Sequence, residues 1–191
     1  MEQAFAWLND LIHWFAQFVP RWAIIGPTHG GCKFVWGSHV KTLGPGWHLW
    51  WPLSTHLHVY PTARQATDLR AQVITTSDDK SILVGGLITY EIKDIEAILA
   101  RTYDPEETIN DLALTAFHEV CCRKDWQTIK DGQKTGALDR EIRESARKAL
   151  ERYGVRVLKT SLTDLAPCTV MKLVTHGPHG AAVVPIEHPD A

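Results

Sequence analysis

The sequence predicts an α+β domain in which a bent antiparallel β-sheet is packed by about three helices and preceded by an N-terminal amphipathic helix. Three observations support this class. From Trp22 to Ile92 the chain consists of short apolar runs, rich in β-branched and aromatic residues, separated by Gly, Pro and Asp turns. Near Lys93 the apolar period changes from two residues to that of a helix. A last apolar run, Val155 to Leu162, is expected to rejoin the sheet.

The composition allows one domain of ordinary size with appendages. The chain has 191 residues, and its hydrophobic content of 45% can fill a core. A formal net charge of -2 gives no reason to expect nucleic acid as a partner. The four cysteines, at positions 32, 121, 122 and 168, do not form a disulfide framework, so a reducing compartment fits.

Residues 2–19 show the clearest helical pattern, with one apolar side that covers roughly half of the circumference. Pro20 ends this helix. The opposite side carries Asn9, Asp10, His13 and Gln17, among others. The apolar side is formed by Ala4, Phe5, Trp7, Leu8, Leu11, Ile12, Trp14, Phe15, Phe18 and Val19.

Several interpretations of this helix compete. Its polar residues interrupt every window long enough to span a bilayer, and the acidic start without Lys or Arg does not fit a signal peptide. A helix docked on its own domain remains open. We favour an interfacial helix that lies in the membrane plane with Trp and Phe facing the acyl chains.

The segment from Gly44 to Pro52 places three tryptophans beside a tight turn. In a strand, Trp47, Leu49 and Trp51 would point to one face and His48 and Trp50 to the other. The segment is therefore either a core strand buried on both faces or a surface that presses on a membrane interface. The second interpretation, together with the interfacial helix, predicts two membrane contacts. Their residues are Phe5, Trp7, Leu8, Leu11, Ile12, Trp14, Phe15, Phe18, Trp47, Leu49, Trp50 and Trp51.

The other predicted strands are short. Residues 22–36 read as a hairpin turning through Gly26-Pro27 and Gly30-Gly31, and residues 37–42 as a connector. A strand follows at 57–60, and residues 67–92 read as strand, Asp78-Asp79-Lys80 turn and strand. Gly85-Gly86 inside the last strand indicates a bulge or the close approach of another backbone.

Three helices are predicted after Lys93. The first begins after Asp94 as N-cap, and the second begins at Asp104-Pro105. A polar break at 125–136 precedes a third helix at 137–153, which Gly154 ends. After Val174 the composition predicts a loose tail.

Six short motifs occur in order along the chain. They are Leu43 to His48 with Trp51-Pro52, Asp68-Leu69-Arg70 with Gln72, Thr76 to Lys80, Ile88 to Asp94, Leu112 to Glu119, and Tyr153 to Val157 continuing to Thr163-Asp164-Leu165-Ala166-Pro167. Together they resemble the SPFH family, also called band 7 or prohibitin homology and including stomatin-like proteins, over about residues 23–174. The hallmark turn of that family would be Gly44, Pro45 and Gly46.

The resemblance implies a non-enzymatic, membrane-associated scaffold that self-associates into a homo-oligomer, of which a ring is one form. It also implies that the protein organises lipids or partner membrane proteins, including proteases or channels. We expect a peripheral or monotopic protein at the cytoplasmic face. The predicted organisation is a membrane-associating helix at 1–20, the SPFH-like domain at 21–174 and a tail at 175–191. No sustained heptads follow the domain, so self-association is expected to use the domain itself.

No catalytic, cofactor-binding or metal-binding residues are predicted. His118 and Cys122 share one helix face, but two ligands do not make a metal site. The stretch Gly132 to Gly136 lacks the spacing of a phosphate-binding loop. Two other classes stay open: a soluble interaction subunit that uses the aromatic N-terminal surface for protein contact, and a hydrolase or metal-dependent enzyme whose catalytic residues come together only in space.

Overall fold

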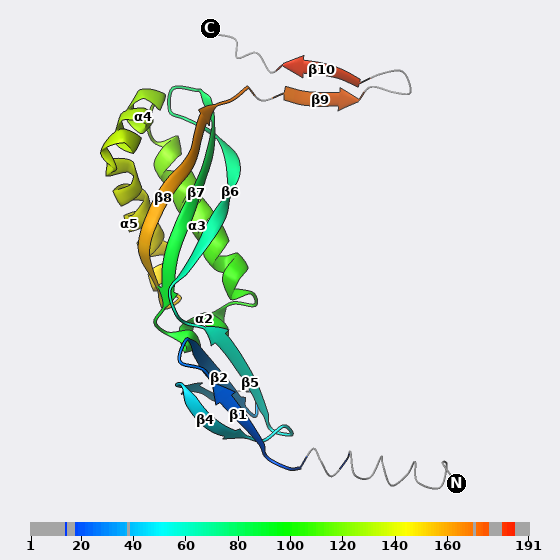
Figure 1. Ribbon diagram of the computed structural model, residues 1–191. Helices are drawn as coiled ribbons and strands as arrows, with labels where there is room; N and C mark the ends of the chain where they lie inside the picture. Colours follow the sequence, from blue (N-terminus) through cyan, green and yellow to red (C-terminus); the bar gives the residue numbers. More distant parts are fainter. Residues whose placement is uncertain (1–13, 15–17, 38, 170, 176–180, 186–191) are drawn as a thin grey trace. The chain divides into compact units, whose positions relative to one another are not determined.

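The computed structural model describes residues 14, 18–37, 39–169, 171–175 and 181–185 (Figure 1). These residues form two compact units. Unit 1 contains residues up to 65 together with 91–106 and 151–156, and unit 2 contains residues 66–90, 107–150 and those from 157 onward. The predicted helix at 2–19 falls almost entirely outside the described residues.

Unit 1 contains two small antiparallel sheets. In the first, β1 (Arg21–Ile25) pairs with β4 (Gly46–Trp50). In the second, β2 (His29–Val35) lies between β3 (His39–Leu43) and β5 (Thr55–Pro61). The predicted hairpin at 22–36 is therefore wrong, because β1 pairs with β4 and not with β2. The predicted connector at 37–42 is also wrong, since most of it forms β3.

Two adjacent glycines allow β2 to pack on both of its faces. A Cβ atom on Gly31 would lie 2.6 Å from Cδ1 of Ile25 in β1, and one on Gly30 would lie 3.2 Å from Cδ1 of Ile95. Ile95 begins helix α2 (Ile95–Arg101), whose N-cap is Asp94 as predicted. Gly30 and Gly31 were expected in a turn, but they lie inside the strand because close packing requires them there.

Unit 2 is built on a sheet with the order β6-β7-β8, formed by β6 (Gln65–Thr75), β7 (Ser81–Ile92) and β8 (Val155–Pro167). The Cys168 N–H donates to the Ser81 carbonyl at 3.0 Å, so the end of β8 meets the start of β7. The late strand therefore rejoins a sheet as predicted. The strands between Trp22 and Ile92 are divided among three sheets, however, instead of forming one continuous sheet.

Three helices pack with this sheet: α3 (Pro105–Cys122), α4 (Trp126–Thr135) and α5 (Ala137–Glu151) (Figure 1). Alternate residues of β7, such as Ile82, Val84 and Ile88, are fully buried. Facing them, Phe117 of α3 lies where a Cβ atom on Gly86 would stand. A Cβ atom on Gly86 would also lie 3.0 Å from the Ser161 carbonyl oxygen of β8, so the predicted close approach of another backbone is found here. The α+β class with antiparallel sheets is confirmed as well.

The sequence predicts a polar break at residues 125–136, but the structure has helix α4 there. Its start is fixed by Asp125, whose side chain accepts hydrogen bonds from the Thr128 N–H at 3.1 Å and the Thr128 hydroxyl at 2.6 Å. Gly136 ends it at a φ of 67°, in the left-handed region. Ile129 is its one buried residue, so the helix shows too little apolar periodicity to be recognised in the sequence.

The segment near the C-terminus contains a short two-stranded sheet. Strand β9 (Met171–Thr175) pairs antiparallel with β10 (Ala181–Pro185). The expected loose tail at 175–191 therefore includes a strand that the sequence analysis did not anticipate. Among the described residues, none of the helices has both the length and the apolar character needed to cross a bilayer.

Candidate functional site: an exposed apolar face in unit 1

The outer face of the β1–β4 sheet carries four large apolar side chains in the open. The register places Trp22 opposite Leu49 and Ile24 opposite Trp47. Their exposed fractions are 69% for Trp22, 66% for Ile24, 69% for Trp47 and 46% for Leu49. Directly paired residues in an antiparallel sheet share a face, so these four residues form one surface, here named the β1–β4 patch.

The two tryptophans of the patch contact each other across the strands. The ring centroids of Trp22 and Trp47 lie 6.5 Å apart at an interplanar angle of 74°, an edge-to-face arrangement. The opposite face of the same sheet is covered: Ile25 is 2% exposed and packs toward Gly31, and Trp50 is half-buried. The interpretation of β4 as a core strand buried on both faces is therefore wrong.

The predicted membrane-binding residues near β4 divide between the two faces. Trp47 and Leu49 belong to the patch, whereas Trp50 points to the covered face, as the alternation of side chains predicts. Trp51 follows the strand and is 46% exposed. The structure thus brings Trp47 and Leu49 together with two residues, Trp22 and Ile24, that the sequence analysis assigned only to a strand. Trp22 and Ile24 are two residues apart in a strand, and this spacing already indicates that they share a face.

The turn before β4 has the geometry that its glycines suggest. Gly46 has a φ of 135°, a conformation that residues with a side chain rarely adopt. The ring Nε2 of His48 lies 2.7 Å from the carbonyl oxygen of Gly44, which ties the start of β4 back to the turn. The Gly44-Pro45-Gly46 turn therefore sets where β4 begins and which of its residues face outward.

A second group of exposed apolar residues lies at two neighbouring loops. Trp36, between β2 and β3, is 78% exposed, and Leu53, between β4 and β5, is 58% exposed. The Trp36 N–H donates to the Ser54 carbonyl at 2.9 Å, which joins the loops. Trp36 has a φ of 52°, a strained conformation for a bulky side chain. The sequence around Trp36 contains no local pattern that indicates a left-handed conformation, so this residue is not among the predicted site residues.

The described part of the N-terminal segment also exposes apolar side chains. Trp14 is 55% exposed and Phe18 41%, and their rings meet edge to face with centroids 5.0 Å apart. Their separation of four residues fits one face of a helix. The remaining residues predicted to bind membrane in this segment lie outside the described residues: Phe5, Trp7, Leu8, Leu11, Ile12 and Phe15.

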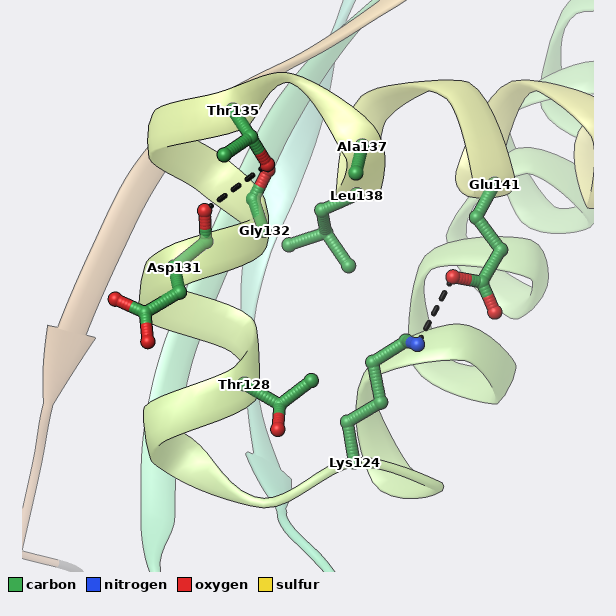
Figure 2. A pocket seen from close by; sticks show the side chains of 8 residues that line it. All are labelled: Lys124, Thr128, Asp131, Gly132, Thr135, Ala137, Leu138 and Glu141. Atoms are coloured by element: carbon green, nitrogen blue, oxygen red, sulfur yellow. Dashed lines mark hydrogen bonds and ion pairs between the residues drawn. The ribbon is translucent and has the colours of Figure 1, made fainter.

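Unit 2 contains an open hollow lined by α4 and α5, with a volume of about 300 Å³ (Figure 2). On one side of the hollow the Lys124 ammonium pairs with the Glu141 carboxylate, and the Nζ to Oε2 distance is 2.9 Å. Thr128, Asp131 and Thr135 line the other side. The charged groups there are paired within the protein, so the hollow offers a mixed polar surface and no activated nucleophile.

The described part of the chain has no cluster of side chains that could form a metal centre. Within the described ranges, no three His, Cys, Asp or Glu side chains are placed to hold one ion. Burial raises the pKa of the Cys121 thiol to about 11, and burial followed by the charges of Glu96 and Asp94 raises the pKa of Cys32 to about 11. Both thiols are therefore poor nucleophiles near neutral pH.

Comparison with known proteins agrees with the motifs and the fold. Residues 23–172 match the SPFH domain / Band 7 family. The chain is also similar to an uncharacterized protein of Methanocaldococcus jannaschii, with 22% identity over 144 residues, which cover 75% of this chain and 71% of that protein. The family match spans both units and most of the chain. The chain therefore belongs to the SPFH domain / Band 7 family.

Proposed function

We propose that the protein is a non-enzymatic scaffold that attaches to a membrane surface through the β1–β4 patch and self-associates there. Family membership supports this class, because SPFH proteins are generally membrane-associated and non-enzymatic. The observation that carries the proposal is the patch itself: Trp22, Ile24, Trp47 and Leu49 are exposed together on one sheet face. Contiguous exposed apolar surfaces of this kind mark sites that bind a partner or a membrane.

A bilayer interface is a suitable partner for the chemistry of this patch. Indole rings combine an apolar body with a polar N–H, and they are enriched at the boundary between lipid headgroups and acyl chains. Full burial of a large apolar side chain contributes about 1.5–3 kcal/mol, so four partly exposed residues can supply useful binding energy. Because the patch is part of a paired sheet, insertion does not require ordering of that backbone.

The N-terminal helix is proposed as a second contact. Trp14 and Phe18 are exposed at its described end, and the predicted apolar side continues through Phe15, Ile12 and the residues before them. An amphipathic helix of this kind lies in the interface with its apolar side toward the acyl chains. Attachment at the cytoplasmic face, as a peripheral or monotopic protein, fits a chain without a disulfide framework.

Liposome flotation of the full chain tests the proposal. A variant with Trp22, Ile24, Trp47 and Leu49 all changed to Ser should lose at least tenfold in affinity for neutral phosphatidylcholine vesicles. The four side chains are exposed, so its circular dichroism and thermal midpoint should stay close to those of the parent. The matched control changes Val73 and Tyr103 to Ser, which are 51% and 106% exposed and lie outside the patch.

Two outcomes would contradict attachment through the patch. One is that the four-residue variant floats as well as the parent protein. The other is that the parent ignores vesicles and instead hides the patch in a contact with another protein, which would favour the soluble interaction subunit. On neutral vesicles, raising the salt concentration should change binding little, because apolar burial is not screened by ions.

Self-association is the second part of the proposal. Helix α5 alternates acids and bases on its exposed side, including Glu144, Arg147 and Lys148, and this face suits polar contacts between copies. A ring is one form that head-to-tail contacts would give, and membrane proteases or channels are the kind of partner that such an assembly would organise. Mass photometry in detergent should show oligomers at micromolar concentration, and a purely monomeric sample would contradict this part.

A further inference from the structure

One side of helix α5 carries a row of three arginines that form no ion pair with the described residues. Arg140, Arg143 and Arg147 are spaced three and four residues apart, so they share one side of the helix. Arg140 and Arg147 are exposed, and Arg143 is half-buried. None of the ion pairs among the described residues involves these arginines. This surface is here named the arginine row, and it is a positively charged strip along α5.

The arginine row lies on the side of α5 that faces away from α3. On the side toward α3, the Ser145 hydroxyl donates to the Glu119 carboxylate of α3 at 3.4 Å. Glu141, one turn earlier on the same side, pairs with Lys124, which follows α3 closely in the chain. Each residue advances about 100° around a helix, so Arg143, two residues from both Glu141 and Ser145, lies roughly 200° away from them. The arginine row therefore faces outward from the layer of helices.

The start of the row borders β8, an edge strand of the β6-β7-β8 sheet (Figure 1). The Asp139 carboxylate accepts a hydrogen bond from the Leu162 N–H of β8 at 3.1 Å. Asp139 stands one turn before Arg143 on the same side of α5, so the arginine row begins at the β8 edge of unit 2. Because Asp139 is bound to the β8 backbone, the acid left beside the row is the exposed Glu144. Three arginines beside this one acid leave the strip with an excess of positive charge.

Helix α3 meets the opposite edge of the same sheet, and it is acidic. The side chain of Gln72 in β6, the other edge strand, donates to the Leu114 carbonyl oxygen of α3 at 3.2 Å. The helix has no Lys or Arg, and its acids are Glu106, Glu107, Asp111 and Glu119. Glu119 pairs with Arg123 at 2.8 Å, whereas Asp111 enters none of the ion pairs of the described residues. The two edges of unit 2 therefore carry charges of opposite sign.

A hollow beside β6 contains the Asp111 side chain. It is open, has a volume of about 460 Å³ and is lined by Gln72, Asp111, Leu114, Thr115 and His118. Its lining combines a carboxylate with polar groups and the half-buried Leu114 side chain. An arginine has a matching composition, because its apolar stem packs on aliphatic surface while its guanidinium binds a carboxylate. We name this feature the α3 hollow.

We propose that the arginine row of one copy of the chain binds the α3 hollow of the next copy. The inference rests on the proposed self-association and adds the two surfaces that meet. The complementary charges favour a second copy as the partner, because both surfaces belong to the same chain. The surfaces differ and lie at opposite edges of unit 2, so the contact is head-to-tail. Each added copy then offers the same two surfaces again, and a ring forms where the rotation closes.

Exchange of charges tests this contact in the full-length protein by mass photometry in detergent. The row variant Arg140→Glu, Arg147→Glu places acids opposite Asp111, and the hollow variant Asp111→Arg places an arginine opposite the row. Each variant alone should assemble at least tenfold more weakly than the parent, because like charges then face each other. A mixture of the two variants should assemble again, since the reversed row of one meets the reversed hollow of the other.

The control variant is Lys130→Glu, Lys134→Glu in α4, which changes the net charge as much as the row variant does and alters exposed residues. It should assemble like the parent, and equal loss of assembly in this control would reduce the effect to net charge. Circular dichroism checks that each variant is folded. The milder variant Arg140→Gln, Arg147→Gln, with weaker assembly expected, keeps the test valid if reversed charges destabilise α5.

The outcomes separate this inference from the proposed function. If the parent is monomeric, the self-association part of the proposed function fails. If the parent assembles and the row and hollow variants assemble equally well, these surfaces are not the contact while self-association stands. If both variants lose assembly but their mixture does not recover it, the two surfaces do not meet each other and the inference is overturned. A row variant that assembles normally but loses binding to anionic vesicles would assign the arginines to lipid headgroups instead.

Discussion

Gly86 shows how a single missing side chain fixes the packing of unit 2. A Cβ atom at this position would lie 2.6 Å from Cζ of Phe117 and 3.0 Å from the Ser161 carbonyl oxygen. Both are rigid neighbours: one is a buried ring in α3, and the other is backbone in β8. Glycine is therefore required where α3 crosses β7. The pair Gly85-Gly86 in the sequence indicates a bulge or the close approach of another backbone, but it does not indicate the contact with the Phe117 ring.

The substitution Gly86→Ala should lower the free energy of unfolding by about 1–3 kcal/mol, because the Phe117 ring must leave its position. Chemical denaturation followed by circular dichroism measures the change. Adding Phe117→Leu should recover part of the loss by making room. Gly44→Ala is the matched control, since no atom lies within 4 Å of a Cβ there. Equal effects of the two alanine substitutions would contradict the packing argument.

Asp78 is the residue most sensitive to acid in the β6–β7 turn. The Thr76 hydroxyl, the Lys80 ammonium and the Trp126 N–H all donate to its carboxylate, and they lower its pKa to about 2 from the ordinary 3.8. A depressed pKa stabilises the fold above the unfolded value and loses that contribution as pH falls. Unfolding stability should therefore decline between about pH 4 and pH 2, and Asp78→Asn should flatten this part of the curve. An NMR titration that gives Asp78 an ordinary pKa would refute the assignment.

The role of a residue can be predicted from the sequence when that role depends only on residues close to it in the chain. Asp94 caps α2 and Gly154, with a φ of 71°, ends the turn after α5, both as the sequence indicated, because caps depend on a few neighbouring residues. The exposure of Trp22 could not be predicted in the same way. Alternation along a strand says which residues share a face, but the covering of that face depends on distant chain segments.

Among the elements, the strands of unit 1 and helix α4 were the least predictable. Strand β1 pairs with β4 across two intervening strands, and no local pattern distinguishes that pairing from a hairpin with β2. Helix α4 owes its place to its caps and to one buried residue, Ile129. In contrast, α3 and α5 carry a regular series of buried residues, including Ile109, Phe117, Ile142 and Leu150, and were predicted within a few positions.

The cap of α4 should therefore be worth a measurable part of the stability of unit 2. Replacing Asp125 with Ala removes its two hydrogen bonds to Thr128 and should cost about 0.5–2 kcal/mol of unfolding free energy. Asp131→Ala, in the exposed middle of the same helix, is the control and should cost less than half as much. Thermal and denaturant unfolding of the two variants measure these changes. If Asp131→Ala lowers the free energy of unfolding more than Asp125→Ala does, the cap is not the main interaction that stabilises α4.

At the scale of the whole molecule, the described residues concentrate exposed large apolar side chains in unit 1 and a regular helix-on-sheet core in unit 2. Family membership came from motifs spread over both units, so it was predictable from the sequence. The surface proposed to bind membrane was predictable only in part, because half of the β1–β4 patch comes from β1.

The helix predicted at residues 2–19 is the second proposed membrane contact. Changing Phe5, Leu8, Leu11, Ile12 and Phe15 together to Ser should weaken flotation with vesicles, since it removes the apolar side of the helix while leaving unit 1 and unit 2 folded. Flotation and circular dichroism of the same sample measure both properties. A variant that stays bound would remove the helix from the membrane contact, and one that unfolds would show that these residues are core.

The most direct measurement is the depth of Trp47 at a bilayer. Cys122 and Cys168 are first changed to Ser, whereas Cys32 and Cys121 are buried and stay unlabelled. A nitroxide is then attached to a cysteine introduced by Trp47→Cys. A second protein, labelled through Gln127→Cys in α4, is the control. Power-saturation EPR then compares access of oxygen and of a water-soluble nickel complex with and without vesicles. If the β1–β4 patch enters the bilayer, vesicles will raise oxygen access and reduce nickel access at position 47, with no change at position 127. Unchanged nickel access at position 47 in vesicle-bound protein would contradict it.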